Sequence, residues 1–198
     1  MLRSLATCVA VAFCGLASVG HAGFVLFDDF DAEVPALNQD VFQNFVVFDG
    51  TVDLVSTGMF SIVCAGGTGN CVDLDGSTQD SGVLTSQEIF GPGLFELRFF
   101  LSGNQRDGNT DSVLVSLGDL EETFSLVGTS GFQEFVRVVT IDETGSQLRF
   151  AGLGGDNVGL VLDDVSLARV PEVGSLSLLL LWAVVGGVAR VRRRGQRS

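Results

Sequence analysis

The sequence has no lysine and no tyrosine, and it holds only one histidine and one tryptophan. The histidine, His21, lies in the N-terminal leader described below, so the remaining domain has no imidazole for a Ser-His-Asp or Cys-His arrangement or for a zinc site. The tryptophan, Trp182, lies in an apolar run near the C-terminus. The domain between them therefore lacks the flat Trp and Tyr faces on which sugar-binding platforms usually depend.

Carboxylates are the remaining candidates for catalysis. A glycosidase needs two of them facing each other across a cleft, one with a raised pKa. Residues 23–170 contain 23 Asp and Glu, but the sequence around them singles out no pair. We therefore expect that the protein is not an enzyme.

Basic residues are scarce in the same segment, which has five arginines and a net charge of about −18. Phosphate backbones would repel so acidic a domain, and this excludes nucleic acid as a partner. Solubility outside the cell and cation binding are the two uses that remain for the charge.

The N-terminus resembles a signal peptide. Arg3 precedes an uncharged apolar run at 5–19, and Gly20-His21-Ala22 suits a cleavage site because its first and third residues are small. We expect a signal peptide at 1–22, a mature chain that starts at Gly23, and export. The alternative, a buried first helix, is disfavoured because no capping residue or polar face interrupts the run.

Only two cysteines remain after the signal peptide, which takes Cys8 and Cys14 with it. Cys64 and Cys71 close the Gly-rich stretch CAGGTGNC in an oxidising compartment, so we expect a disulfide between them. A metal site on this pair is the weaker alternative, since two thiolates alone cannot complete a tetrahedral site.

The middle of the chain is rich in short β patterns separated by Gly, Asn and Asp. From Phe95 to Leu101 the odd positions are apolar, whereas Glu96 and Arg98 lie on the opposite face. Helical periodicity is hard to find between residues 23 and 170. About ten strands at this spacing favour an all-β, two-sheet antiparallel sandwich over an α/β fold. The clearest predicted strands are 93–101, 112–118, 132–141 and 158–167.

Two sets of acidic residues are candidate calcium ligands because calcium prefers hard oxygen donors. The first is the pairs Asp28/Asp29 and Asp163/Asp164, which could meet at strand ends. The second and weaker set is Asp107, Asn109 and Asp111, which have the spacing of a calcium loop but lack the turn Gly and the bidentate Glu of an EF-hand. The alternative for this second set is an ordinary turn between two strands.

The stretch VDLDGSTQDSGVLTSQEIFGPGLFELRFFLSGNQRDGNTDSVLVSLGD, with GGDNVGLVLDDVSL at the end, resembles the exported jelly-roll domains of PEP-CTERM proteins. Such domains are similar to galactose-binding-like and carbohydrate-binding modules. The resemblance covers residues 23–168 and implies a jelly-roll domain at 23–170. It also implies that the first and last strands pair, which would place FDDF (27–30) beside LDDVSL (162–167).

The C-terminal 28 residues resemble a PEP-CTERM sorting signal. The motif Val170-Pro171-Glu172 precedes sixteen uncharged residues at 174–189, which we expect to form a transmembrane helix, and an Arg-rich tail follows. The resemblance implies that an exosortase-type membrane protease recognises and cleaves the signal. Val173 replaces the usual second proline, so a permanent anchor is the alternative. The tail arginines, expected in the cytoplasm, are Arg190, Arg192, Arg193 and Arg194.

These observations leave two classes of function open. One is an exported surface or extracellular-matrix protein, associated with exopolysaccharide or biofilm, whose precursor is anchored in the inner membrane. The other is a carbohydrate-binding module with a structural calcium, delivered by the same route. An exposed aromatic strip on one sheet face would distinguish the second from the first.

Overall fold

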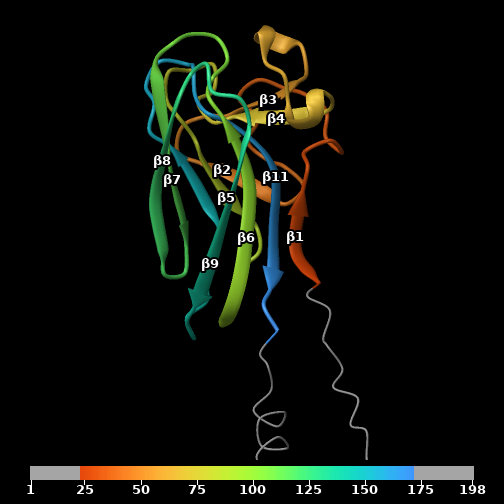
Figure 1. Ribbon diagram of the computed structural model, residues 1–198, viewed down its shortest axis with the longest axis vertical. Coiled ribbons are helices and arrows are strands. Elements are labelled where there is room, and N and C mark those ends of the chain that lie inside the picture. Colours follow the sequence, from red (N-terminus) through yellow and green to blue (C-terminus); the bar gives the residue numbers. More distant parts are fainter. Residues whose placement is uncertain (1–22, 172–198) are drawn as a thin grey trace, which may run out of the picture. The chain divides into compact units, whose positions relative to one another are not determined.

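The computed structural model describes residues 23–171 of the 198-residue chain. These residues form eleven strands and two short 3-10 helices, η1 (Met59–Ser61) and η2 (Ala65–Gly67) (Figure 1). The strands are β1 (Phe24–Asp28), β2 (Phe45–Phe48), β3 (Asp53–Ser56), β4 (Asn70–Asp73), β5 (Val83–Ser86), β6 (Gly93–Ser102), β7 (Thr110–Leu117), β8 (Leu120–Val127), β9 (Gln133–Ile141), β10 (Arg149–Gly152) and β11 (Val161–Arg169).

Several expectations fall outside this range. The signal peptide (1–22), the expected membrane span (174–189), Glu172 of the sorting motif, and the tail residues Arg190, Arg192, Arg193 and Arg194 all lie outside the described residues. Among residues 23–171, no helix is long and apolar enough to cross a membrane.

The strands pair into two sheets. Sheet A has the order β3-β4-β11-β6-β9, with β1 also paired to β11, and sheet B has the order β2-β5-β10-β7-β8. Every strand pair in both sheets is antiparallel. The prediction of an all-β, two-sheet antiparallel sandwich is therefore confirmed, and the four predicted strands correspond to β6, β7, β9 and β11 with ends shifted by up to three residues.

Alternation along β6 shows how the sequence selects this fold. The odd positions from Phe95 to Leu101 are at most 1% exposed and face the other sheet, as predicted. Glu96 and Arg98 point outward and form a salt bridge at 2.8 Å. A strand with one apolar face buries it most completely against a second sheet, because successive side chains point to opposite sides.

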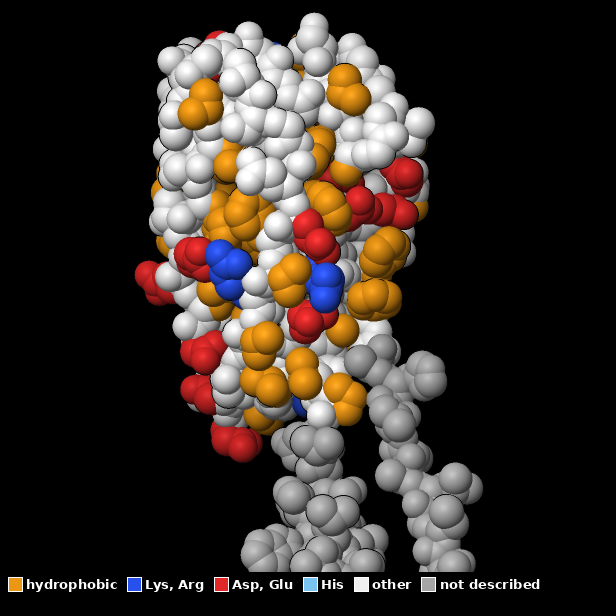
Figure 2. Space-filling view, viewed as in Figure 1, with side chains coloured by type: hydrophobic (Ala, Val, Ile, Leu, Met, Phe, Trp, Pro, Cys, Tyr) orange, Lys and Arg blue, Asp and Glu red, His pale blue; other side chains and the backbone are white. Residues whose placement is uncertain are grey.

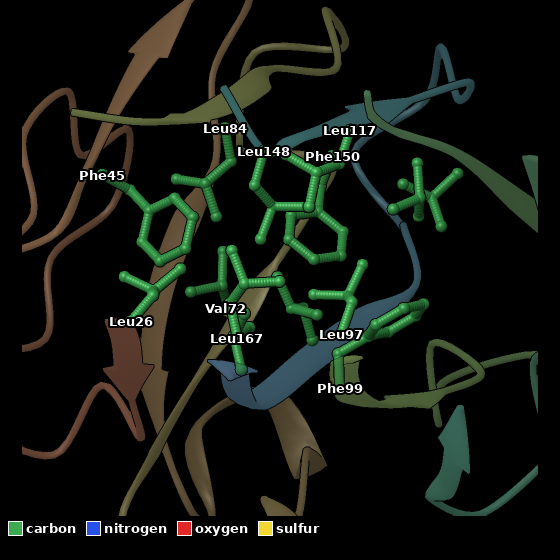
Figure 3. Packing of buried hydrophobic residues seen from close by; sticks show 14 of the residues in the cluster. Leu26, Phe45, Val72, Leu84, Leu97, Phe99, Leu117, Leu148, Phe150 and Leu167 are labelled. Atoms are coloured by element: carbon green, nitrogen blue, oxygen red, sulfur yellow. The ribbon is translucent and has the colours of Figure 1, made fainter. Parts of the chain in front are cut away.

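Leucine and phenylalanine side chains fill most of the core between the sheets (Figure 3). The ring of Phe99 lies 5.3 Å from that of Phe124, 5.6 Å from that of Phe135 and 5.3 Å from that of Phe150, measured between centroids. These residues come from β6, β8, β9 and β10, so the cluster joins sheet A to sheet B. Phe99 and Phe150 are fully buried, and such burial of a phenylalanine ring stabilises a fold by roughly 1.5–3 kcal/mol.

The first and last strands lie side by side, as the resemblance implied (Figure 1). Phe27 pairs with Ser166 and Asp28 with Val165. Strand β11 also pairs with β6, and its register shifts between Asp163 and Ser166. Asp164 has a φ of 48° within this irregular stretch, so its side chain leaves the regular alternation of the strand.

Candidate functional sites

The two predicted acidic pairs meet where β1 ends beside β11, but one member of each pair points inward. Asp28 is 7% exposed and accepts hydrogen bonds from the N–H of Phe30 (2.9 Å) and from Nδ2 of Asn44 (3.1 Å). Burial raises its pKa. Asp163 is 4% exposed and accepts bonds from the N–H of Ala65 at Oδ2 and of Asp164 at Oδ1. Both inward carboxylates therefore organise the protein's own backbone.

The outward members of the pairs form an acidic edge together with a third acid. Burial raises the pKa of Asp164, and the nearby charges of Asp29 and Asp31 raise it further. Asp31 also accepts the N–H of Asn70 at 2.6 Å. Sequence reasoning missed Asp31, although it directly follows the FDDF stretch. The edge concentrates negative charge and suits a cation better than an anion.

The disulfide Cys64–Cys71 is part of a second, smaller hydrophobic cluster in the described residues. Its Sγ atoms lie 2.10 Å apart, and both cysteines are at most 2% exposed beside Val55, Ile62 and Val161. The sulfurs and a carboxylate oxygen of Asp163 lie within 4.8 Å of one another. Because the sulfurs are bonded to each other, they are not thiolates and cannot act as metal ligands in this state.

The loop between β6 and β7 holds the weaker set of predicted calcium ligands in a network of amide hydrogen bonds. Asn109 donates its N–H to Oδ1 of Asp107 (2.9 Å) and its Nδ2 to Oδ2 (2.7 Å). Nδ2 of Asn104 donates to Oδ1 of Asp107 and Oδ2 of Asp111, both at 2.7 Å. These bonds lower the pKa of Asp107 and occupy both of its oxygens, so Asp107 shapes the loop as an Asx turn does.

A buried ion pair ties three loops together at the same end of the sandwich. Asp73 is 1% exposed; Oδ2 accepts from Arg106, and Oδ1 accepts the N–H groups of Asp75 (3.2 Å) and Gly159 (3.1 Å). Burial raises the pKa of Asp73 to about 7, and the Arg106 guanidinium opposes that rise. Sequence reasoning did not single out this pair, because 33 positions separate its members.

The outer face of sheet B carries a hollow of about 330 Å³, lined by Val41, Val46, Phe48, Gln87 and Gln147. Phe48 is 54% exposed. The amide nitrogen of Gln87 donates to the carbonyls of Phe42 and Phe45, and that of Gln147 donates to the carbonyl of Ser86. Main-chain acceptors thus hold both amide nitrogens in place.

Thr85 and Arg149 follow Val46 on the neighbouring strands β5 and β10. In register across the sheet, Val46 pairs with Thr85 and Thr85 pairs with Arg149, so the three side chains share the outer face. Oγ1 of Thr85 is buried and has no hydrogen-bond partner among the described residues. The hollow therefore combines an exposed phenyl ring with fixed polar groups, the mixture that ligand sites commonly present.

Exposed phenylalanines are not lined up on one sheet face, and one of them, Phe60 (48% exposed), lies in η1 outside both sheets. Phe48 is the exposed one on sheet B, while Phe24 (65% exposed) and Phe27 (52% exposed) lie on β1 at the edge of sheet A, with ring centroids 5.9 Å apart. In the described part of the chain, the outer face of sheet B thus carries a single exposed phenyl ring and β1 carries two, so the aromatic strip that would mark a large sugar platform does not form on sheet B.

On the face shown in Figure 2, acidic side chains are scattered over the middle and lower parts, with few basic ones between them. Three of the five arginines in the domain, Arg98, Arg106 and Arg137, pair with acids of the same chain. The surface therefore keeps a strong excess of negative charge, which disfavours polyanionic partners.

The fold resembles two solved structures of binding domains. The K1 cleaved adhesin domain of Lys-gingipain from Porphyromonas gingivalis matches with a TM-score of 0.53 and 12% identity, over 74% of this chain and 98% of that one. The CBM22-1-GH10 modules of xylanase 10B from Clostridium thermocellum, solved with xylohexaose, match with a TM-score of 0.50 and 17% identity, over 75% of this chain and 29% of that one. No family model and no curated protein sequence matches the chain. The described residues thus form a β-sandwich of the kind seen in adhesin and carbohydrate-binding domains.

Proposed function

We propose that this chain is an exported, non-catalytic surface or extracellular-matrix protein that associates with a neutral polysaccharide through the outer face of sheet B. The observation that carries the proposal is the hollow beside Phe48, where an exposed ring lies next to the fixed amides of Gln87 and Gln147. A sugar ring offers an apolar face to the phenyl group and hydroxyls to the amide oxygens. The likeness in fold to a carbohydrate-binding module supports this choice.

The charge of the domain narrows the class of polysaccharide. With a net charge of about −18 between residues 23 and 170, the domain repels uronate-rich or sulfated polymers at low ionic strength. A neutral exopolysaccharide has no such penalty. The same charge keeps the domain soluble in a crowded matrix.

Co-sedimentation tests this proposal with the full chain in detergent and insoluble xylan, β-glucan or the producing organism's own exopolysaccharide. We expect retention on at least one neutral polymer and none on alginate. If the protein binds none of the neutral polymers, the proposal is contradicted. A structural role in the matrix without a specific ligand would then remain.

The titratable groups support a non-catalytic role. Asp73 and Asp163 are the described carboxylates whose pKa rises to about 7, the range expected of a general acid. Both are at most 4% exposed, and both oxygens of each accept hydrogen bonds within the protein. Neither can reach a substrate without breaking the backbone contacts that hold it.

Export and sorting complete the proposed role. The N–H of Val170 donates to the carbonyl of Leu94 at 2.9 Å, and Pro171 is exposed just beyond this last contact. The first two motif residues, Val170 and Pro171, thus follow the end of the strand, and this supports recognition of the motif by an exosortase-type protease while the expected span at 174–189 anchors the precursor in the inner membrane. Mass spectrometry of the mature termini tests this step. A C-terminus before residue 174 supports cleavage, whereas an intact Ser198 would favour a permanent anchor.

Calcium at the acidic edge of β1 and β11 is the remaining part of the proposal. Asp29 and Asp164, helped by Asp31, offer hard oxygen ligands outside the hydrogen-bond network of Asp28 and Asp163. A bound ion would offset the mutual repulsion of these charges and fasten the first strand to the last. If EDTA leaves the unfolding temperature unchanged, and Asp164→Asn does the same, this edge holds no calcium.

A further inference from the structure

Asp75, in the loop after β4, has a carboxylate oxygen that the protein leaves without a partner. The residue is 1% exposed, and its Oδ2 lies 3.5 Å from the N–H of Asp156. Its Oδ1 is buried and accepts no hydrogen bond from any described residue. A buried carboxylate oxygen costs free energy unless a donor or a cation satisfies it, so this atom points to a ligand.

Two other carboxylates lie close enough to Asp75 for their charges to raise its pKa. The charges of Asp156, between β10 and β11, and of Asp111, near the start of β7, both act on Asp75. Asp111 accepts Nδ2 of Asn104 at Oδ2 (2.7 Å), and Asp156 accepts the N–H of Val158 at Oδ1 (2.9 Å). The second oxygen of each accepts no hydrogen bond from the described residues. Three carboxylates therefore each present one oxygen that the described chain leaves open.

The backbone of the loop before β11 lies close to the carboxylate of Asp75. A Cβ on Gly154 would overlap Oδ2 of Asp75, so only glycine lets the loop before β11 approach the carboxylate at this point. Arg106 forms its salt bridge with Asp73 and none with Asp75, Asp111 or Asp156, although its charge acts on Asp111. The three carboxylates are thus held near one another with no paired basic side chain of their own in the described residues.

We propose that Asp75, Asp111 and Asp156 bind a calcium ion that joins the β4-β5 loop, the start of β7 and the β10-β11 loop. Calcium takes six to eight oxygen ligands in flexible geometry and accepts water among them, whereas magnesium demands a tighter octahedron. The three oxygens do not all lie within 4.8 Å of one another, so the ion draws in the exposed Asp156 loop or reaches one carboxylate through water.

This site differs from the calcium loop that sequence spacing suggested. Asp107 and Asn109 satisfy each other through hydrogen bonds, and Asn104 supports the same turn. Only Asp111 is shared between the two sets. The site at Asp75 also shares no residue with the edge at Asp29 and Asp164, so different substitutions test each site.

Calcium titration of the EDTA-treated full chain, followed by isothermal calorimetry, tests the proposal directly. The probes are CaCl2 and, as a comparison, MgCl2. The site variants are Asp75→Asn and Asp156→Asn; Asp156 is exposed, so its substitution leaves the fold intact. The matched control is Asp80→Asn, an exposed aspartate in the same β4-β5 loop. Asp164→Asn removes the other candidate site.

We expect a binding event that Asp75→Asn and Asp156→Asn weaken at least about tenfold and that Asp80→Asn and Asp164→Asn preserve, with a dissociation constant of about 0.1–1 mM as in extracellular modules. Calcium bound at the edge of β1 and β11 would give a separate event, which Asp164→Asn removes and Asp75→Asn leaves unchanged. Binding should weaken as the pH falls, because protons compete for the carboxylates; burial raises the pKa of Asp75 and of Asp111, and Arg106 is the basic group nearby that acts on Asp111. Calcium binding that is unchanged in both site variants, or absent from the wild type, would overturn the proposal.

In EDTA, Asp75→Asn should be at least as stable as the wild type, since it removes a buried charge that lacks a partner. If Asp75 only organised the loop, the same variant would be less stable with or without calcium. This comparison separates a ligand role from a structural one.

Discussion

Asp163 on the last long strand accepts a hydrogen bond of 2.9 Å from the N–H of Ala65, which lies 98 positions earlier inside the disulfide loop. Its other oxygen accepts the N–H of Asp164 at 2.8 Å. One buried carboxylate thus holds the Cys64–Cys71 loop against β11. Burial raises its pKa to about 7, even though these two hydrogen bonds favour the charged form.

The raised pKa of Asp163 predicts how stability depends on pH. Its pKa is about 7 in the folded protein and 3.8 as the reference for the unfolded chain, so the folded state binds the proton more tightly. The stability that this proton supplies is complete below the unfolded pKa and is lost as the pH rises through about 7. Thermal unfolding should therefore show a midpoint that falls over this range, and Asp163→Asn should flatten the fall. An equal slope in both proteins would show that Asp163 does not titrate there.

Reduction of the disulfide should destabilise the domain without changing its fold class. The ring closed by Cys64 and Cys71 is short, with a sequence separation of 7, so the chain-entropy relation gives about 2.5 kcal/mol at room temperature. Urea unfolding of the protein with both cysteines replaced by serine measures this loss. A variant as stable as the wild type would mean that the second hydrophobic cluster holds the loop unaided.

The phenylalanine cluster between the sheets should dominate core stability. Phe99→Ala removes a fully buried ring with three aromatic neighbours and should cost about 3–5 kcal/mol in the free energy of unfolding. Phe27→Ala removes a ring that is 52% exposed and should cost less than about 1 kcal/mol. Chemical denaturation of both variants measures the two losses in the free energy of unfolding. Equal losses would argue against the core as described.

Processing should respond to the one position where the sorting motif departs from its usual form. Val173→Pro restores the V-P-E-P sequence and should raise the fraction of cleaved chain in a host that has the exosortase. Pro171→Ala should lower it. Immunoblots of membrane and culture fractions measure both. If neither substitution alters the cleaved fraction, the exosortase does not recognise this motif.

Local pattern was enough to predict much of the fold. Alternation along β6 depends only on neighbouring residues, and Gly, Asn and Asp mark where strands end, so the strands and the two-sheet class followed from the sequence. The pairing of β1 with β11 joins residues about 140 positions apart. It was expected only because the chain resembles a known type of domain.

The candidate sites were harder to predict because their parts come from distant strands. The hollow beside Phe48 needs Gln87 and Gln147, and the spacing between these residues has no local signature. The open oxygen of Asp75 becomes visible only when the surrounding loops are in place. For Asp107 and Asn109, spacing alone left a calcium loop and an ordinary turn open, whereas the structure shows these two side chains hydrogen-bonded to each other. Side-chain hydrogen bonds of this kind depend on conformation, which the order of residues leaves open.

Polysaccharide binding by the outer face of sheet B is the central claim, and affinity electrophoresis of matched variants tests it most directly. Phe48 and Phe27 are almost equally exposed, at 54% and 52%, but they lie on opposite sheets. In gels that contain the neutral polymer retained by the wild type, Phe48→Ala should lose the retardation, whereas Phe27→Ala should migrate as the wild type does. Retardation that survives Phe48→Ala and disappears with Phe27→Ala would place the binding surface on sheet A and contradict the account.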